Sequence, residues 1–597
     1  MKELFLAYLF PLVTSLMLAC PYRFSERFIT RVTIISILFP AIASVFLLYL
    51  PLPTEILLAQ ISLSGHAFPI LAWIDHNTLA MLGLTHVLGL LVAKFSHGYL
   101  HLEKGYQRYF STILFFIFGM DILSLAGNMD LFFAGWEVVG FSSFLLIAFY
   151  RSHSRSVNNA WRIYNLYRIC DLGILIGAVL GHVLWHEATR FGSLASIPSE
   201  AFSSTHQTSL TVLYMCIVFA SLGKSAQFPF YNWPARAMEG PTPSSAIFYG
   251  ALSIHAGVFL LLRTQPLWSH NLFVTISIGL IGLTTLFLSS IQGRIQTNIK
   301  GQIAYASTSQ IGIMFIELSF GLNKIVLLHL VCHALYRCFQ LLVSPSVVAS
   351  STSLSNKSIF QKIQNRKNWL DALPVRWRDT LYVLGASEFF MDISWRGFGF
   401  LPWQLMQRKL KILVSHSAIP VIMLTLPLIS LFFDYYHSAL IFSVGSFFFS
   451  LRSIWVHHSP FLAMRDLSLG LVGCMITVYL LGPHDLALIE AYMIPITPFL
   501  LAAIIISWIF RKCDLRIYHA LGTAHTLKAN IFMVCFMILA GMPISTAFIG
   551  EDMLLENLLH HSPLITGFIT VCLLINGLLC VKIYSRLFMG RPTLNTP

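Results

Sequence analysis

The residues best placed to do chemistry in this sequence are charged side chains inside long apolar runs. Glu137 stands in Leu131-Phe-Phe-Ala-Gly-Trp-Glu-Val-Val-Gly140, and Lys224 follows the apolar run Tyr214 to Leu222. A charge near the centre of a bilayer costs at least roughly 2.5–3.5 kcal/mol, so such residues are rare and usually functional. A carboxylate near a lysine stabilises the ammonium, and its movement away favours proton release. The pair therefore predicts a switchable proton site; the alternative is a static buried ion pair that fixes helix register.

More charged and titratable residues stand in the runs that follow. Arg168 and Asp171 are three positions apart and can pair on one face of a helix. His329, His333 and Arg337 recur every four residues, so they line one stripe of a helix. Because histidine titrates near neutral pH, this stripe favours a hydrated proton path over a set of hydrogen-bonded core histidines.

Further positions extend the predicted path. His255 lies deep in an apolar run, where a role in the relay and a purely structural role both stay open. Lys300 begins a small and polar stretch, ending at Gln310, whose hydroxyl groups could hold water. Glu551 and Asp552 follow Pro543 at the end of a predicted span, either as a polar exit or as a helix end at the membrane interface.

Holding these charges requires membrane-spanning helices. Of 597 residues, 56% are hydrophobic and 11% are charged, whereas soluble domains carry about 25% charged residues. A helical span needs about 20 mostly apolar residues, and about 15 to 17 such windows follow one another along the chain. The sequence predicts an all-α fold, a polytopic bundle of transmembrane helices. The predicted spans are 4–20, 30–50, 78–99, 109–127, 129–150, 163–185, 210–228, 241–263, 272–292, 299–320, 323–344, 417–435, 438–456, 467–482, 488–510, 527–549 and 562–586.

Breaks in these spans divide the chain. Prolines after Lys224 and at 241 and 243 predict broken helices, which in transporters often flank ion sites. We expect N-terminal spans and a loop in 1–75, a translocating core in 76–345 and further spans in 417–597. Residues 346–416 form a basic segment, expected on the cytoplasmic side. Its aromatic residues favour a position on the membrane surface or on a partner, and a solvated loop is the alternative.

Composition also excludes several classes of protein. The net charge of +13 comes from basic residues in loops between spans, which indicates orientation in the membrane and no nucleic-acid partner. The ten cysteines include no Cys-x-x-Cys, and no dinucleotide-binding glycine motif occurs. We therefore expect no metal and no cofactor in this chain, and any redox reaction would belong to partner subunits. Met1 to Cys20 is interpreted as a retained first span, not a cleaved signal.

At these residues the chain resembles the antiporter-like membrane subunits of respiratory complex I and of Mrp-type multisubunit cation/proton antiporters. The likeness is closest to the NuoL type, or NADH-quinone oxidoreductase chain 5. It rests on Gly135-Trp-Glu-Val-Val-Gly140, on Arg168-Ile-Cys-Asp171-Leu-Gly173, and on Gly223-Lys224-Ser-Ala-Gln227 continuing to Ala237-Met-Glu-Gly-Pro-Thr-Pro243. The resemblance implies that Glu137 and Lys224 are the paired charges of a proton channel, with Arg168 and Asp171 in support. It also implies that His329 and His333 belong to a central hydrated axis.

The chain departs from this family at several positions. Tyr249 stands where the family usually has histidine, and Arg337 and Gly550 stand where it has lysines. Arginine effectively cannot deprotonate, so Arg337 is a poor proton carrier. About four extra spans are also predicted after the histidine stripe.

Three functions stay open from the sequence. The first is a proton-translocating subunit of a complex I-like assembly in a bacterial inner membrane or an organellar inner membrane. The second is a NuoL-like subunit of a non-redox complex, such as a bicarbonate or CO2 uptake system or a cation/proton antiporter. The third is a structural membrane partner. In each, the partners are the lipid bilayer and other membrane and peripheral subunits, and the transported ion is the proton, with Na⁺ as the alternative.

Overall fold

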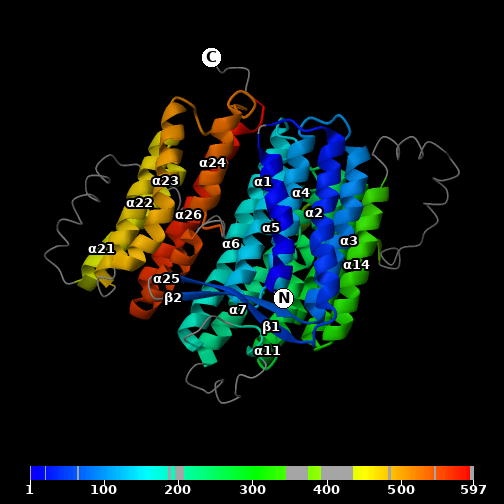
Figure 1. The fold of residues 1–597 in the computed structure, drawn as a ribbon. Coiled ribbons are helices and arrows are strands. Elements are labelled where there is room, and N and C mark those ends of the chain that lie inside the picture. The colour runs from blue at the N-terminus through cyan, green and yellow to red at the C-terminus, as the bar shows by residue number, and fades with distance from the viewer. Residues whose placement is uncertain are drawn as a thin grey trace.

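The computed structural model shows long helices packed side by side (Figure 1). It describes residues 2–20, 22–63, 66–185, 190–194, 207–344, 374–390, 435–481, 486–542 and 546–591. Within these ranges, 13 helices are long and apolar enough to cross a membrane, and Thr208–Lys224 and Thr526–Leu539 are shorter apolar helices. The chain is a polytopic, mostly helical membrane protein, as the sequence predicts.

The first half of the chain supplies the helices around the predicted site. Asn128 caps α5 by accepting a hydrogen bond from the N–H of Leu131 at 3.2 Å, which satisfies one of the free donors at a helix start. A side chain at Gly135 would lie 2.5 Å from the backbone of Leu123, so glycine allows α4 and α5 to pack closely. The elements are η1 (Lys2–Leu9), α1 (Phe10–Ala19), α2 (Glu26–Leu47), α3 (His76–Tyr99), α4 (Tyr106–Leu125), α5 (Met129–Ile147), α6 (Ser154–Trp185) and α7 (Gln207–Lys224).

The predicted span 241–263 is a series of short pieces. Two prolines at its start donate no hydrogen bond, and the following residues are π-helical before the α-helix resumes. The span comprises α9 (Thr242–Ser245), η4 (Ala246–Ala251), η5 (Ser253–His255) and α10 (Ala256–Arg263), and the short helices α8 (Trp233–Ala237) and α11 (Gln265–Trp268) lie before and after it. Three regular helices follow: α12 (Leu272–Ile295), α13 (Ile299–Ser319) and α14 (Asn323–Val343).

One β-hairpin accompanies this mostly helical fold. Strands β1 (Thr54–Leu63) and β2 (His66–Ile74) pair antiparallel, with Thr54 opposite Ile74. The polar sequence between the strands leaves each apolar run too short to span a bilayer as a helix. The two runs pair with each other, and the backbone hydrogen bonds form between the strands. The hairpin lies against the start of α5, because the N–H of Gly127 donates to the carbonyl of Leu71 at 2.8 Å.

The C-terminal helices form a group beside the first half, where α6 contacts α25 and α26 (Figure 1). The predicted span 527–549 is wrong as one helix, because α24 ends at Leu539 and α25 begins at Ala547. Residues 417–434 of the predicted span 417–435 lie outside the described residues, as do most of residues 346–416. The elements are α17 (Val375–Ala386), η7 (Glu388–Phe390), α21 (Tyr435–Trp455), α22 (Pro460–Leu481), α23 (Leu486–Ile509), α24 (Thr526–Leu539), α25 (Ala547–His561) and α26 (Pro563–Phe588).

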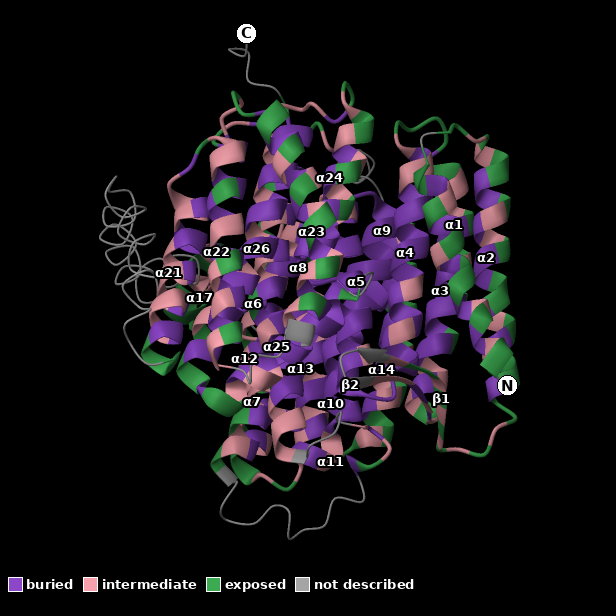
Figure 2. Cartoon of the chain, turned by 60° about the vertical axis from the view of Figure 1, so that its left-hand side comes forward, coloured by how far each residue is buried: buried purple, intermediate pink, exposed green. Residues whose placement is uncertain are grey.

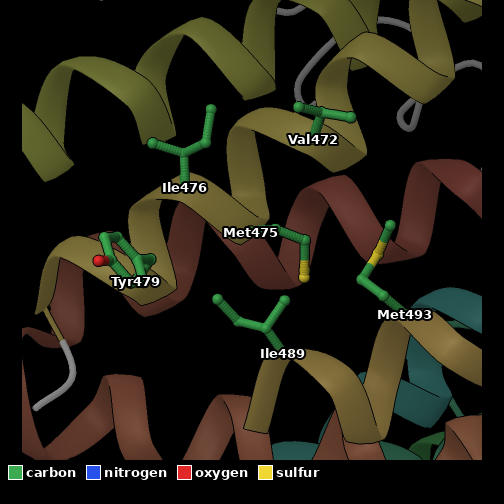
Figure 3. A pocket seen from close by; sticks show the side chains of 6 residues that line it. All are labelled: Val472, Met475, Ile476, Tyr479, Ile489 and Met493. Carbon is green, nitrogen blue, oxygen red and sulfur yellow. The ribbon is translucent and has the colours of Figure 1, made fainter. Parts of the chain in front are cut away.

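Burial separates the centre of the bundle from its outer faces. Helices α4 and α5 are buried along nearly their whole length, whereas α1 and α2 expose many side chains (Figure 2). Outward side chains such as Leu280 and Phe287 are apolar, as expected of faces that contact lipid. An apolar groove of about 280 Å³ between α22 and α23 is lined by residues such as Met475 and Met493 (Figure 3). The charges of the predicted site lie instead in the buried centre.

Candidate functional site

Lys224 is the last residue of α7 and is almost completely buried. Its Nζ donates to the main-chain carbonyl of Trp136 at 3.0 Å and lies 4.5 Å from the ring centre of Tyr167. The negative end of the helix dipole and a facing aromatic ring both stabilise a cation. Ala226, at φ 51°, turns the chain away directly after the lysine. The helix break therefore presents the ammonium to the interior of the bundle.

Glu137 forms its ion pair with Arg168, not with Lys224. The Nη1 atom of Arg168 lies 2.6 Å from Oε1 of Glu137, and both side chains are buried. Neither the direct Glu137–Lys224 pairing nor the Arg168–Asp171 pairing on one helix face is formed. Arg168 instead extends across to α5, where it pairs with Glu137. An ion pair in a dry interior needs good geometry, and Glu137 provides it across the helix interface.

Asp171 and Lys224 are linked through one residue. The indole N–H of Trp136 donates to Oδ1 of Asp171, while the main-chain carbonyl of Trp136 accepts from Lys224. Gly140, one turn along α5, leaves space for the ammonium, because an added Cβ would lie 2.7 Å from Nζ. The four charges predicted from sequence thus gather around α5, with Trp136 as the connecting residue.

The break between α24 and α25 contributes to the same cluster. Arg168 donates from Nη2 to the carbonyl of Ala540, one of the carbonyls left free where α24 ends, at 2.9 Å. Glu551 places its carboxylate directly against Gly541, and it interacts electrostatically with Arg168. Glu551 lies in the second turn of α25, near the start of that helix and not directly after the end of one long span 527–549.

A second cluster is a chain of hydrogen bonds. Nε2 of His255 lies 2.9 Å from Nδ1 of His333, and Nε of Arg337 donates to Nε2 of His333 at 3.2 Å. At the other end, Nδ1 of His255 lies 2.5 Å from the carbonyl of Ala251. Arg337 always donates and a carbonyl always accepts, so both neutral histidines carry their proton on Nδ1. The chain of donated hydrogen bonds therefore has a fixed direction, which begins at the guanidinium of Arg337 and ends at the carbonyl of Ala251.

His329 belongs to a separate branch. Its Nδ1 lies 3.0 Å from a carboxylate oxygen of Glu317, and its Nε2 lies 3.1 Å from Oε1 of Gln310. The ring centres of His329 and His333 are 6.2 Å apart. The predicted stripe therefore exists on α14, but its three members enter two different hydrogen-bond groups.

Comparisons with known proteins match the part of the chain that contains these residues. A family model for the membrane subunits of NADH:quinone oxidoreductase and Mrp antiporters matches residues 126–371. A second model, for the N-terminus of complex I chain 5, matches residues 61–110. The matched ranges include Glu137, Lys224 and the histidine stripe. The chain belongs to this family of antiporter-like membrane subunits.

Individual relatives are similar over part of their length. NADH-quinone oxidoreductase subunit L of Buchnera aphidicola subsp. Schizaphis graminum is 31% identical over 378 residues, which is 61% of this chain and 60% of the relative. The chloroplastic NAD(P)H-quinone oxidoreductase subunit 5 of Brachypodium distachyon is 35% identical over 283 residues, 47% of this chain and 38% of the relative. The alignments thus span 60% or less of these relatives. The solved Mrp complex from Dietzia sp. DQ12-45-1b aligns with a TM-score of 0.49 at 17% identity, over 96% of this chain and 74% of that chain.

The departures from other antiporter-like subunits have structural counterparts. Tyr167 supplies a ring beside the Lys224 ammonium. Tyr249, where the family has histidine, packs edge-on against Trp233 with ring centres 5.3 Å apart. An added Cβ at Gly550 would lie 2.8 Å from the backbone of Tyr492, so close packing of α25 on α23 leaves no space for a lysine.

Lys300 is the last of the residues predicted from sequence, and three further residues of the site were not predicted. Lys300 lies in the first turn of α13, at a helix start and not in the middle of an apolar span. The sequence analysis did not single out Trp136, Glu317 or Glu388 as site residues. Glu317 interrupts an apolar run, which is a usable signal. Glu388 accepts from Arg236 and from Asn232, in the loop that follows Lys224, and sequence spacing gives no indication of this contact.

Proposed function

We propose that this chain is a proton-translocating membrane subunit of a complex I-like assembly of the NADH-quinone oxidoreductase type. The observation that carries the proposal is the buried Lys224 at a helix break, with Asp171 linked to it through Trp136 and with Glu137 paired to Arg168. A lysine with a carbonyl and two rings as neighbours can hold its proton or release it, depending on how close a carboxylate is.

The proton-loading step depends on Arg168. In the observed arrangement its guanidinium neutralises Glu137, so no carboxylate contacts the Lys224 ammonium and proton release is favoured. Movement of the Arg168 guanidinium away from Glu137 and toward Glu551, with its bond to the carbonyl of Ala540 kept, would free Glu137 to stabilise the ammonium. Glu551 is therefore proposed to exchange for Glu137 as the partner of Arg168. This role replaces the exit beyond the histidines that the sequence suggested.

The relay beyond Lys224 begins close to it. The hydroxyl of Ser225 donates to the carbonyl of Ile254, the residue before His255, at 2.8 Å. This contact brings the lysine and the start of the histidine chain together. Because Arg337 closes that chain with a group that does not deprotonate, a proton leaving His333 must use another route. We propose His329, with Gln310 and Glu317 as its partners, and place Lys300 at the outer end of α13, near the path but outside its hydrogen-bonded part.

The partners and location follow from the same proposal. The relatives are named as subunits, so we propose other membrane and peripheral subunits as partners, within a bacterial inner membrane. An organellar inner membrane is the alternative, because chloroplastic relatives also match. We propose that the chain holds no redox cofactor, so that oxidation and reduction take place in the partners.

Flux measurements in proteoliposomes test this function. Replacing Lys224 with Ala is expected to abolish proton flux driven by a pH gradient, and Lys224→Arg should do the same because the charge is kept but cannot be released. The matched control is Lys512→Ala, since Lys512 is exposed outside the site. Undiminished flux in both Lys224 variants would overturn the proposal.

A cation/proton antiporter is the second candidate function. It is favoured by Arg337 and Gly550, which alter the part of the path where other members of the family have lysines. An Na⁺ gradient in the same proteoliposomes distinguishes the two, because an antiporter exchanges Na⁺ for protons. Co-purification of iron–sulfur subunits supports the redox assembly, whereas a zinc-bearing soluble partner indicates a bicarbonate or CO2 uptake complex.

A further inference from the structure

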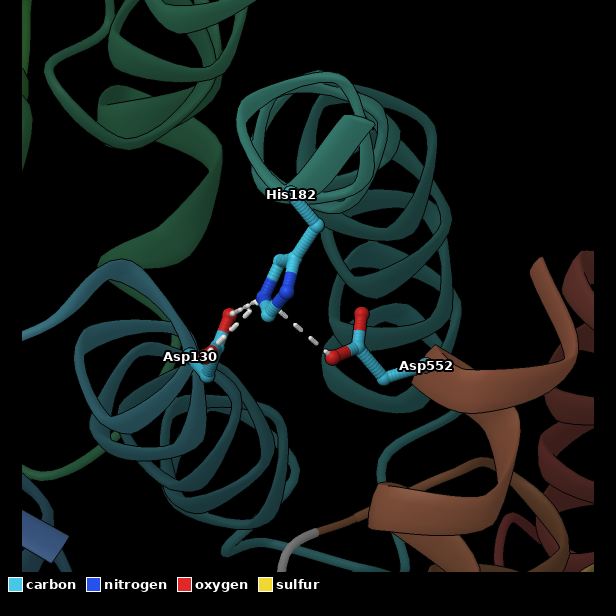
Figure 4. A group of neighbouring side chains, drawn as sticks. All are labelled: Asp130, His182 and Asp552. Carbon is cyan, nitrogen blue, oxygen red and sulfur yellow. Dashed lines mark hydrogen bonds and ion pairs between the residues drawn. The ribbon is translucent and has the colours of Figure 1, made fainter. Parts of the chain in front are cut away.

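Three side chains from distant parts of the sequence converge where the C-terminal helices meet the core. Asp130 of α5, His182 of α6 and Asp552 of α25 point toward one another (Figure 4). One ligand atom from each lies within 4.8 Å of the others. Asp130 is 3% exposed and Asp552 8% exposed, so two buried carboxylates face one imidazole. The cluster is separate from the charges around Lys224.

The spacing within the cluster fits a metal ion better than direct ion pairs. Nε2 of His182 lies 3.3 Å from both carboxylate oxygens of Asp130 and 3.7 Å from Oδ2 of Asp552. A charge-assisted N–H to carboxylate bond is about 2.7–2.9 Å long. Two ligands that each lie about 2.0–2.1 Å from a tetrahedral ion are about 3.3–3.4 Å apart. The distances from His182 to Asp130 match the edge of such a coordination shell, and the distance to Asp552 is slightly longer than that edge.

A further carboxylate lies beside the second ring nitrogen of the imidazole, beyond direct hydrogen-bond distance. Nδ1 of His182 lies 3.9 Å from Oε2 of Glu556, one turn after Asp552 on α25. Histidines that bind metals usually direct their second ring nitrogen to a carboxylate or carbonyl, which fixes the ring orientation. Nε2 is thereby left to face the two aspartates.

We propose that Asp130, His182 and Asp552 bind a divalent first-row transition-metal ion, with Zn²⁺ as its representative. One imidazole nitrogen and two carboxylate oxygens suit this class of ion, and solvent can complete a four-coordinate shell. The prediction of no metal considered cysteine spacing and could not include ligands from three distant helices.

The position of this metal site gives it a structural task. Helices α5, α6 and α25 each supply one metal ligand and one member of the buried charge cluster: Glu137, Arg168 and Glu551. Asp130 and Glu137 are two turns apart on α5, a rise of about 10 Å, and lie on the same face. The ion therefore fixes the spacing of the three helices whose charges exchange partners.

Metal binding to the full-length chain in detergent tests the proposal directly. After chelator treatment, the protein is expected to take up one equivalent of Zn²⁺, measured by elemental analysis and calorimetry. Asp130→Asn, His182→Gln and Asp552→Asn should each weaken binding at least 100-fold. Glu556→Gln should weaken it about tenfold, because it acts through His182.

The control removes another histidine–carboxylate pair. His101 lies 2.7 Å from Glu26 on the surface, and His101→Gln should leave Zn²⁺ affinity unchanged. Co²⁺ in the unmodified chain provides a readout that does not depend on variants folding, because a low-symmetry four-coordinate site absorbs strongly in the visible range. Less than one tenth of an equivalent bound, unchanged affinity in His182→Gln, or a weak six-coordinate Co²⁺ spectrum would each overturn the proposal.

Discussion

Separating the partners of Glu137 by double-mutant cycles is the sharpest test of the charge cluster. Glu137 lies 2.6 Å from Arg168 and has a side chain that is 2% exposed. Removing one member of a buried ion pair costs about 3–5 kcal/mol, because the other charge stays buried without a partner. Replacing both members with groups of similar size is often nearly neutral. The two single changes are therefore strongly non-additive.

The cycle uses Glu137→Gln and Arg168→Met, alone and together. Each single variant is expected to lose about 3–5 kcal/mol of unfolding free energy, and the double variant far less than the sum. The coupling energy should be about 3 kcal/mol or more. A parallel cycle with Glu137→Gln and Lys224→Met should give less than about half of that value, since no ion pair joins these two residues.

Reversible unfolding by SDS in mixed micelles, followed by tryptophan fluorescence, measures these free energies. The purified full-length chain serves as the reference. The reasoning fails if the Arg168 cycle is additive within about 0.5 kcal/mol, or if Lys224 couples to Glu137 more strongly than Arg168 does. The first result would mean that Arg168 is not the energetic partner of Glu137, and the second that Glu137 and Lys224 pair directly, as the sequence first suggested.

Three further predictions concern the rest of the path. Gly140→Ala should reduce proton flux about 10- to 100-fold, because the added Cβ displaces the Lys224 ammonium from a charged hydrogen bond worth about 1.5–3 kcal/mol. Gly98→Ala is the matched control, since Gly98 has open space around it, and its proton flux should equal that of the unmodified chain. Arg337→Lys keeps a donor but can deprotonate, so flux measured from pH 6 to 10 should gain a pH dependence that is absent from the unmodified chain; identical profiles would argue against a fixed donor. Glu388→Gln should increase protease cleavage of residues 374–390 several-fold by weakening the contact with the loop after Lys224, whereas Asp379→Asn, in an exposed pair, should not.

The predictions that proved reliable depend on costs paid by single residues or single helices. A charge inside an apolar run is expensive whatever its partner is, so Glu137 and Lys224 could be identified from sequence. Helical spacing alone places His329, His333 and Arg337 on one side of α14. Prolines after Lys224 and before η4 likewise indicate broken helices, because their missing N–H groups act locally.

Long-range packing decided what the sequence left open. Arg168 pairs with Glu137 because α5 and α6 pack against each other at that point. The end of α24 supplies the carbonyl of Ala540, which accepts from the second terminal nitrogen of Arg168. Glu551 approaches from a helix hundreds of residues later, and its place cannot be read from local spacing. The apolar runs within residues 54–74 are too short to cross a bilayer as a helix. They form a hairpin because pairing of the two strands satisfies their backbone hydrogen bonds.

The sequence by itself therefore determined which residues carry charge into the membrane and that long apolar helices must surround them. Burial cost and helix periodicity are properties of a segment, so they survive without knowledge of its neighbours. Tertiary structure alone decided which acid meets which base, the direction of the His255–His333–Arg337 chain, and the meeting of Asp130, His182 and Asp552. Those outcomes depend on distances between helices, which are set by how side chains pack and not by the order of residues along one segment.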